Sequence, residues 1–288
     1  MSAVPAEFPR VHRRASVVIP AHNEARVIGR TLEALLASED VELDIVVVAN
    51  GCSDDTAAVA ASYAGVRVID LASPGKAGAL NEGDALARWF PRIYLDGDIV
   101  LSPLALSAMI DALETDAARV ASPAVDFDTE GASWPVRAFY DVFTQTPYAT
   151  DSLTGLGVYG LSQAARERFD RFPQLTADDL FVQRLFEPEE RVVADGRFRV
   201  SVPRDLRNLV RVRTRVAKGN TELARQRESE DDTRFESTSS STLRRIGDLV
   251  RKQPRLAPSA GVYIGVSLVS RLRARTTRTR WERDLSTR

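Results

Sequence analysis

The sequence predicts an α/β fold: a mostly parallel sheet flanked by helices, with a short helical appendage at the C-terminus. In the first 125 residues, short β-branched apolar runs alternate with segments whose apolar residues recur at helical spacing. Polar clusters follow three of these runs, and ligands of such sheets gather at the carboxyl ends of the strands. We therefore expect a ligand site along one edge of the sheet.

Composition limits the classes of function. The chain has 288 residues, 44% of them hydrophobic, which is enough for a substantial core. Its formal net charge of −1 gives no argument for a nucleic-acid partner. The single cysteine excludes an internal disulfide and a zinc cluster. No signal peptide and no membrane-spanning run is recognisable, so we expect a cytoplasmic protein.

The first half of the chain supplies five predicted strands and the helices between them. The expected strands cover 15–20, 44–49, 66–71, 92–95 and 120–125. The expected helices cover 24–38, 76–90 and 102–113, with a further alanine-rich helix opening at Asp54. Ser102 and Pro103 provide an N-cap and a first-turn proline for the last of these.

The second half is less regular. Helices are expected over 134–143, 178–186 and 205–225, and two short strands around Val192 and Phe198. The glycine-rich stretch 153–162 is expected to form a loop over the site, because no βαβ unit frames its match to the dinucleotide-binding fingerprint. Residues 226–241 are charged and serine-rich, as in flexible linkers, and two terminal helices are expected over 243–250 and 260–272.

Asp96 and Asp98 flank Gly97 at the end of a buried strand. Two carboxylates this close repel each other unless a cation lies between them. Mg²⁺ or Mn²⁺ fits best, with the coordination completed by substrate phosphates and water. A polar turn is the alternative. His22-Asn23-Glu24 and Asn50-Gly51 end two other predicted strands, which favours a shared site over chance placement.

Four motifs in this order carry a resemblance to a known family: residues 16–24 (SVVIPAHNE), 50–56 (NGCSDDT), 75–81 (GKAGALN) and 95–98 (LDGD). Together they resemble family 2 glycosyltransferases, which are inverting, metal-dependent enzymes of the GT-A fold that use nucleotide-sugar donors. The resemblance is specific over roughly the first hundred residues and weaker up to about Gly219.

The resemblance implies a donor site. Pro20, Ala21, Asn23 and Glu24 would line the base and ribose pocket, Asn50 would pair with the nucleobase, and Lys76 would lie near the nucleotide. Asp96 and Asp98 would bind the metal, Asp98 more directly. Asn50 stands where the family usually has an aspartate; an amide also pairs with a base edge, so UDP- and GDP-sugars both stay open.

The resemblance also implies a catalytic base. Asp178 and Asp179 match the family's Glu-Asp pair, whose second member is the base, but the shorter first side chain leaves the choice between them open. Acids favoured by a helix N-terminus are the alternative interpretation. Arg215 lies in a segment, 211–219, that is similar to the Gln-x-x-Arg-Trp motif beside the leaving diphosphate. The Gln and Trp are absent, which argues against a processive synthase.

The implied function is transfer of a single sugar with inversion, using Mg²⁺ or Mn²⁺, in cell-surface, exopolysaccharide, glycolipid or metabolite glycosylation. The acceptor (glycan, lipid-linked or small molecule) and the oligomeric state stay open. One alternative is a retaining GT-A transferase or a sugar nucleotidyltransferase, although the latter usually has a glycine- and arginine-rich loop where residues 21–24 stand. The other is a non-catalytic nucleotide-sugar-binding protein.

The chain is expected to divide into four parts: an extension (1–14), a GT-A domain (15–225), a linker (226–241) and a basic helical tail (242–288). The domain would comprise a nucleotide-sugar-binding half, 15–125, and an acceptor-binding half, 126–225. For the tail, peripheral contact with the inner face of a membrane and packing on the domain are alternatives.

Overall fold

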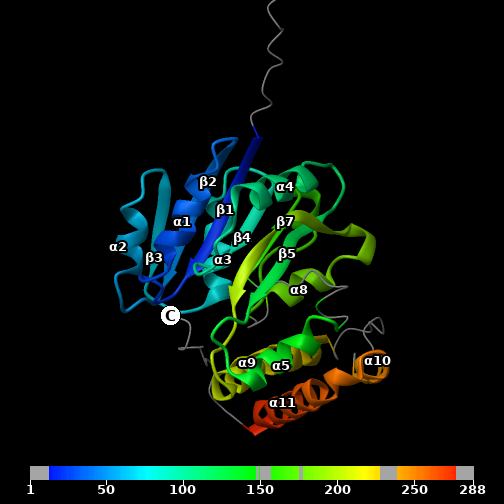
Figure 1. Cartoon of the computed structure of the whole chain (residues 1–288). Helices are drawn as coiled ribbons and strands as arrows, with labels where there is room; N and C mark the ends of the chain where they lie inside the picture. Colours follow the sequence, from blue (N-terminus) through cyan, green and yellow to red (C-terminus); the bar gives the residue numbers. More distant parts are fainter. Residues whose placement is uncertain (1–12, 147–148, 150–156, 175–177, 228–238, 277–288) are drawn as a thin grey trace, which may run out of the picture.

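The computed structural model describes residues 13–146, 149, 157–174, 178–227 and 239–276. Within them lies a seven-stranded sheet in the order β3-β2-β1-β4-β6-β5-β7 (Figure 1). The strands are β1 (Arg13–Ala21), β2 (Val41–Asn50), β3 (Val66–Leu71), β4 (Arg92–Leu95), β5 (Val120–Asp128), β6 (Val158–Leu161) and β7 (Arg191–Ser201). Only β6 runs antiparallel to its neighbours, β4 and β5. The predicted mostly parallel α/β fold is confirmed.

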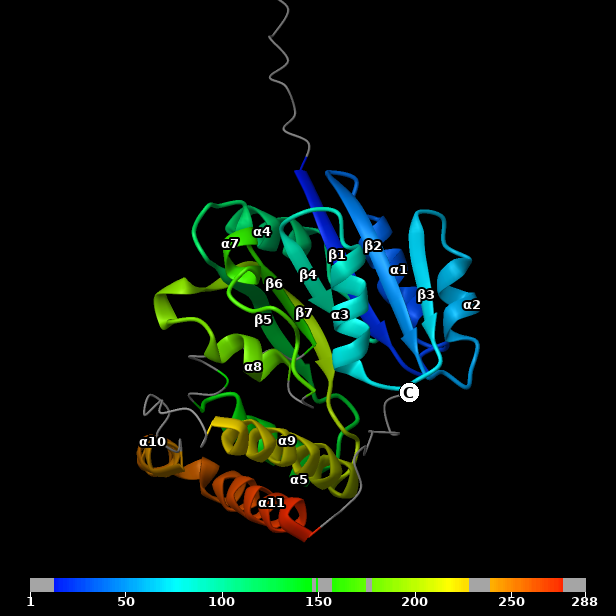
Figure 2. The same cartoon turned by 180° about the vertical axis from the view of Figure 1, so that it is seen from behind.

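Helices cover both faces of the sheet (Figures 1 and 2). On one face lie α1 (Ile28–Leu36), α2 (Thr56–Ala61) and α4 (Pro103–Leu113), which share a core with Val17 and Ile19 of β1. On the other lie α3 (Lys76–Leu86), α7 (Gln163–Arg166) and α8 (Asp178–Arg184), which share a core with Val18. Because both faces are buried, β1 and β2 are apolar without alternation.

The predicted loop over 153–162 is wrong in its second part, because residues 158–161 form β6. Residues 153–156 lie outside the described part of the chain. Glycines favoured a loop, but Gly160 serves close packing: a Cβ there would lie 2.6 Å from Leu113 Cδ1 of α4. A glycine inside a strand often marks such an approach.

The two short strands expected around Val192 and Phe198 are one strand, β7, which pairs with β5. The register shifts between Pro123, opposite Ala194, and Ala124, opposite Arg197, so two residues of β7 bulge out. One of them, Gly196, has φ 91° and lies close against α4, which only glycine tolerates. The bulge interrupts the strand pattern in the sequence.

A layer of helices lies beyond the carboxyl ends of the strands, toward which the arrowhead of β7 points (Figures 1 and 2). Its described members are α5 (Trp134–Phe143), α9 (Leu206–Arg227), α10 (Ser239–Lys252) and α11 (Ala257–Thr276). The rings of Phe139 on α5 and Tyr263 on α11 stack 5.0 Å apart, so the terminal helix packs on the rest of the protein.

The predicted terminal helices are confirmed, and α10 begins at Ser239, inside the segment predicted as a linker. Residues 228–238 of that segment lie outside the described residues. Among the described helices, none is long and apolar enough to cross a membrane.

Candidate functional site

Three segments far apart in the sequence meet at the carboxyl edge of the sheet. Asp96 follows β4, Lys76 is the first residue of α3, and Asp178 is the first residue of α8. Lys76 Nζ lies 2.7 Å from Asp96 Oδ1 and 2.9 Å from Asp178 Oδ1. We name Lys76, Asp96, Asp178 and Asp179 the carboxylate–lysine cluster. It joins the Asp-Gly-Asp motif to the pair at 178 and 179.

Asp178 is only 3% exposed, and both of its carboxylate oxygens are engaged. Lys76 binds Oδ1, and the hydroxyl of Tyr159 on β6 donates to Oδ2 at 3.1 Å. Burial raises the pKa of Tyr159, and so does the Asp178 carboxylate, so the phenol keeps its proton to donate. Burial alone would lower the pKa of Lys76, but Asp178 and Asp96 outweigh it and hold that pKa above its usual value.

Asp179 has a different environment. Its side chain is half-buried, and Oδ1 accepts a hydrogen bond of 2.7 Å from the Leu180 backbone N–H. Burial and the neighbouring Asp178 carboxylate raise the pKa of Asp179 to about 7, although Lys76 acts in the opposite direction. A carboxyl group with this pKa exchanges a proton near neutral pH.

Gly97 is required by close packing inside the Asp-Gly-Asp motif. A Cβ at this position would overlap the Glu24 carboxylate, so any side chain would displace that acid. The Gly97 carbonyl accepts a hydrogen bond of 2.9 Å from Thr31 Oγ1, and the Asp96 N–H donates to the Gly157 carbonyl at 2.7 Å. The backbone of the motif is therefore fixed from both sides, while the Asp98 side chain is exposed.

The predicted donor-pocket residues lie together where β1 and β2 end. Pro20 and Ala21 are buried in β1, and Asn50 ends β2. Asn50 Nδ2 donates to the Ala21 carbonyl at 2.7 Å, and Oδ1 accepts from the Gly75 N–H at 3.0 Å. Asn50 therefore ties two chain segments together, and its contact with a nucleobase stays a prediction.

The turn after β1 is held by two further side chains. Asn23 has a φ of 52°, and its Oδ1 accepts a hydrogen bond of 2.7 Å from the Ser53 N–H. The Glu24 N–H donates to Thr56 Oγ1 at 2.7 Å. Sequence reasoning included Thr56 in the motif 50–56 but gave it no role, because a threonine at a helix start carries no specific signal. It missed Tyr159, which fell in the segment predicted as a loop.

The arginines of α9 differ in what they contact. The guanidinium of Arg213 lies over the rings of Phe139 and Phe143, at 5.4 and 4.9 Å, and so packs α9 against α5. Arg211 contacts Asn208 within its own helix. Arg215 is half-buried on α9, and its contact with a diphosphate stays a prediction.

The carboxylates of Asp96 and Asp98 provide hard oxygen ligands suited to Mg²⁺ or Mn²⁺. Among the described residues, no group of three or more histidine, cysteine, aspartate or glutamate side chains could hold a metal ion by itself. The residues therefore fit a metal only if oxygen atoms of another molecule complete its coordination.

A buried charge network lies behind the cluster, on the same face of the sheet. Asp84 of α3 accepts hydrogen bonds from Arg92 at 2.7 Å, from Tyr94 at 2.5 Å and from Arg166 at 2.7 Å. The ring of Tyr94 in turn stacks on Tyr159 at 5.1 Å. The network therefore packs against the tyrosine that holds Asp178.

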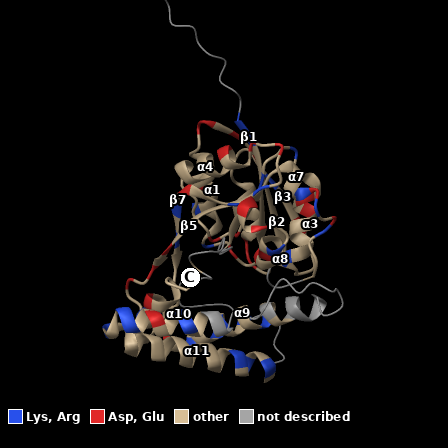
Figure 3. Ribbon diagram, turned by 90° about the vertical axis from the view of Figure 1, so that its right-hand side faces the viewer, with Lys and Arg blue, Asp and Glu red and all other residues tan. Residues whose placement is uncertain are grey.

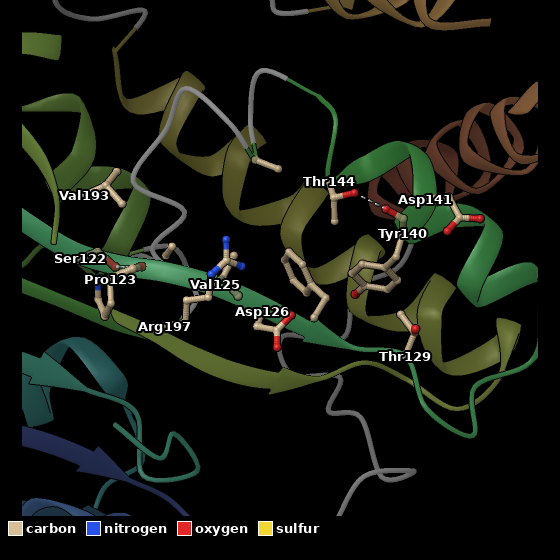
Figure 4. Close-up of a pocket in the computed structure, with 13 residues that line it drawn as sticks. Ser122, Pro123, Val125, Asp126, Thr129, Tyr140, Asp141, Thr144, Val193 and Arg197 are labelled. Carbon is tan, nitrogen blue, oxygen red and sulfur yellow. Dashed lines mark hydrogen bonds between the residues drawn. The ribbon is translucent and has the colours of Figure 1, made fainter. Parts of the chain in front are cut away.

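A cavity of about 480 Å³ lies between the sheet and α5 (Figure 4). Arg197 of β7, Asp126 of β5 and Tyr140 of α5 are among its lining residues. None of the cluster residues lines it, but Ser122, one of its lining residues, donates to the Val158 carbonyl at 2.9 Å. Val158 follows Gly157, the partner of Asp96, so the cavity begins about two strand spacings, roughly 10 Å, from the Asp-Gly-Asp motif.

Comparisons with known proteins agree with this arrangement. A family model described as glycosyl transferase family 2 matches residues 16–166. The 4,4'-diaponeurosporenoate glycosyltransferase of Staphylococcus aureus (strain MRSA252) is 32% identical over 107 residues, which make up 35% of this chain and 28% of that protein. The chain thus covers less than a third of the length of this relative.

One solved structure resembles most of the chain. It is described as the mannosyltransferase PcManGT from Pyrobaculum calidifontis in complex with GDP-Man and Mn²⁺. Its TM-score is 0.62 at 19% identity, and the match covers 90% of this chain and 76% of that one. At this identity the similarity shows the fold alone, and it confirms the expected fold.

Proposed function

The chain belongs to glycosyl transferase family 2, and from this membership we propose that it transfers a single sugar from a nucleoside-diphosphate sugar to an acceptor hydroxyl, with inversion and with a divalent metal. The observation that carries the proposal is the carboxylate–lysine cluster. Through Lys76, this cluster links Asp96 of the Asp-Gly-Asp motif to Asp178 of the acid pair at the carboxyl edge of the sheet.

Asp96 and Asp98 would hold the metal together with the diphosphate of the donor. Lys76 is a cation shared by Asp96 and Asp178, and Asp179 adds a further acid to its surroundings. An anionic diphosphate would be repelled there without a divalent cation. When bound, Mg²⁺ or Mn²⁺ would neutralise charge that develops on the leaving diphosphate. Arg215 of α9 is proposed to contact the leaving diphosphate and to neutralise part of its charge.

Asp179 is the proposed general base. Lys76 and Tyr159 engage the two carboxylate oxygens of Asp178, which suits this residue to a positioning role. Asp179 has a pKa of about 7, close to the value at which a base is both deprotonated and effective. Tyr159 is then a positioning residue, because it acts through Asp178.

The reaction follows from these roles. The acceptor hydroxyl attacks the anomeric carbon on the face opposite the diphosphate and gives its proton to Asp179. A new carbon–oxygen bond forms while the bond from the anomeric carbon to the diphosphate oxygen breaks, so the configuration inverts. The nucleoside diphosphate leaves with the electron pair. Lys76 keeps the Asp96 and Asp178 carboxylates in place during this step.

The two acids can be distinguished by substitution. Asp179→Asn should bind a nucleotide-sugar, measured by thermal shift with Mn²⁺, but should lose turnover by at least a hundredfold. Asp178→Asn should retain part of the turnover, because Asp178 is proposed to position other groups of the site and not to take up the proton. Turnover that survives in Asp179→Asn and disappears in Asp178→Asn would place the base at 178.

The configuration of the product tests the reaction class. Proton NMR of the glycoside should show inversion at the anomeric carbon; retention would favour the retaining alternative. Donor binding without turnover over a broad panel of acceptors would favour a non-catalytic nucleotide-sugar-binding protein.

The donor is proposed to be a UDP- or GDP-sugar, and the acceptor to enter from the cavity beside β5. Most of the residues that line this cavity, from Asp126 onward, belong to the half of the domain predicted to bind the acceptor, and Tyr140 and Arg197 offer the acceptor an aromatic ring and a cation. Glycan, lipid-linked and small-molecule acceptors all fit this description. A cytoplasmic location belongs to the same proposal.

A further inference from the structure

The terminal helix α11 carries apolar side chains on two opposite faces. On the inner face, Ala260 and Val266 are each 5% exposed, and Tyr263 stacks on Phe139 of α5. On the other face, Leu268, Val269 and Leu272 are 54%, 46% and 61% exposed. The helix therefore carries two apolar stripes. Packing on the protein accounts for only one.

The exposed apolar residues form one continuous strip. Gly261, Gly265, Leu268 and Leu272 follow each other at intervals of four, three and four residues, which places them on one side of an α-helix. All four are exposed, and Val269 lies beside them. We name Gly261, Gly265, Leu268, Val269 and Leu272 the outer strip. Its glycines leave the surface flat, and its large side chains gather toward the end of the helix.

Basic residues predominate in the terminal helices, including the helix that carries the outer strip. Residues 242–276 contain eight arginines and lysines and a single acid, Asp248. On the ribbons of α10 and α11 in Figure 3, blue is accordingly more extensive than red. Arg271 and Arg275 are exposed on α11 itself, within one turn of Leu272. Apolar residues in a basic surround are typical of helices that lie in the interface of an anionic membrane.

We propose that the outer strip and its arginines bind the surface of an anionic lipid bilayer, with α11 lying in the plane of the membrane. The alternative is that the outer strip binds a second copy of the chain. Two such faces would bring like charges together, which opposes self-association, whereas anionic headgroups complement them.

The position of α11 relates the membrane contact to the candidate site. The helical layer lies beyond the carboxyl ends of the strands, where the carboxylate–lysine cluster also lies (Figure 1). A membrane on α11 would therefore face the same end of the protein as the site. This relation rests on the proposed function and would suit an acceptor carried by a lipid; the binding itself does not require transferase activity.

Flotation of the full-length protein with vesicles tests the proposal. Vesicles of phosphatidylcholine with 30% phosphatidylglycerol should carry the protein up the gradient, and pure phosphatidylcholine vesicles should not. Leu268→Ser with Leu272→Ser should weaken the binding at least tenfold. Arg271→Gln with Arg275→Gln should weaken it about thirtyfold, and raising the salt concentration should weaken wild-type binding further.

A matched control is available at the opposite edge of the sheet. Leu36 and Leu86 are exposed at 43% and 45% and end α1 and α3. Leu36→Ser with Leu86→Ser should float like the wild type. Equal flotation of all variants, or none by the wild type, would overturn the proposal. So would a wild-type dimer in solution that only Leu268→Ser with Leu272→Ser converts to a monomer, because the strip would then bind a second copy.

Discussion

Replacing the buried acid behind the site should destabilise the protein strongly. Asp84 has a side chain only 6% exposed and pairs with Arg92 and Arg166, which are 15% and 12% exposed. Asp84→Asn removes the negative charge and leaves two buried guanidinium groups facing each other. Breaking one side of a buried pair costs about 3–5 kcal/mol, and the retained amide oxygen favours the lower end of this range.

Thermal unfolding measures this effect. For a chain of this size, about 3 kcal/mol corresponds to a decrease in Tm of roughly 6–12 °C. The matched control is Glu42→Gln, which removes the half-exposed ion pair of 3.2 Å with Arg14 and should cost less than about 1 kcal/mol. If Asp84→Asn lowered the Tm no more than Glu42→Gln does, the network would not stabilise the fold and our reasoning would be refuted.

The same carboxyl group predicts a dependence on pH. Burial opposes ionisation of Asp84, but hydrogen bonds from Arg166 and Tyr94 and the charge of Arg92 outweigh it and lower its pKa. A carboxyl group whose pKa is lowered by folding stabilises the fold at pH values above its pKa in the unfolded chain, which is near 4. This stabilisation is lost as the pH falls further. The difference in the free energy of unfolding between wild type and Asp84→Asn should therefore be constant around neutral pH and should decrease below about pH 4.

Three further predictions concern the site. Gly97→Ala should displace the Glu24 carboxylate and weaken donor binding at least tenfold with only a small change in Tm, since a flexible side chain can move aside; unchanged donor affinity by calorimetry would contradict this. The protein without donor should bind Mn²⁺ only weakly, because protein atoms supply part of the coordination; tight binding in a calorimetric titration would count against a metal shared with the diphosphate. Below about pH 7, kcat/KM should fall tenfold per pH unit as Asp179 takes up a proton. Asp178→Asn should shift this fall in kcat/KM to lower pH, because it removes the neighbouring charge that raises the pKa of Asp179. If the substitution did not shift it, the fall would not report the protonation of Asp179.

Much of the sheet could be predicted because its signals are local. The strands β1 and β2 contain the unbroken apolar runs 17–21 and 45–49, and Ser102 caps α4 with its side chain as its position before Pro103 suggests. The convergence of the three polar clusters also followed from the sequence, since the carboxyl ends of parallel strands meet at one edge.

The parts that were missed depend on distant partners. β6 has only four residues, one of them glycine, and it becomes a strand through β4 and β5, from which it is separated by many residues. The ion pair of Lys76 with Asp178 joins positions about a hundred residues apart, which no local pattern reveals. For the same reason the role of Tyr159 could not be read from its neighbours.

The position of β6 also decides how separable the two halves of the chain are. A fragment that ended after α4 would contain β1 to β4 but would leave one side of β4 without its partner. Its exposed edge, 92–95, carries Ile93, Tyr94 and Leu95, all buried in the whole protein, so we expect such a fragment to aggregate. It would also lack the Gly157 carbonyl that fixes Asp96. The part of the sheet built from β1 to β4 is thus not an independent module, and exchanging the rest of the chain between relatives would have to include the strand that matches β4.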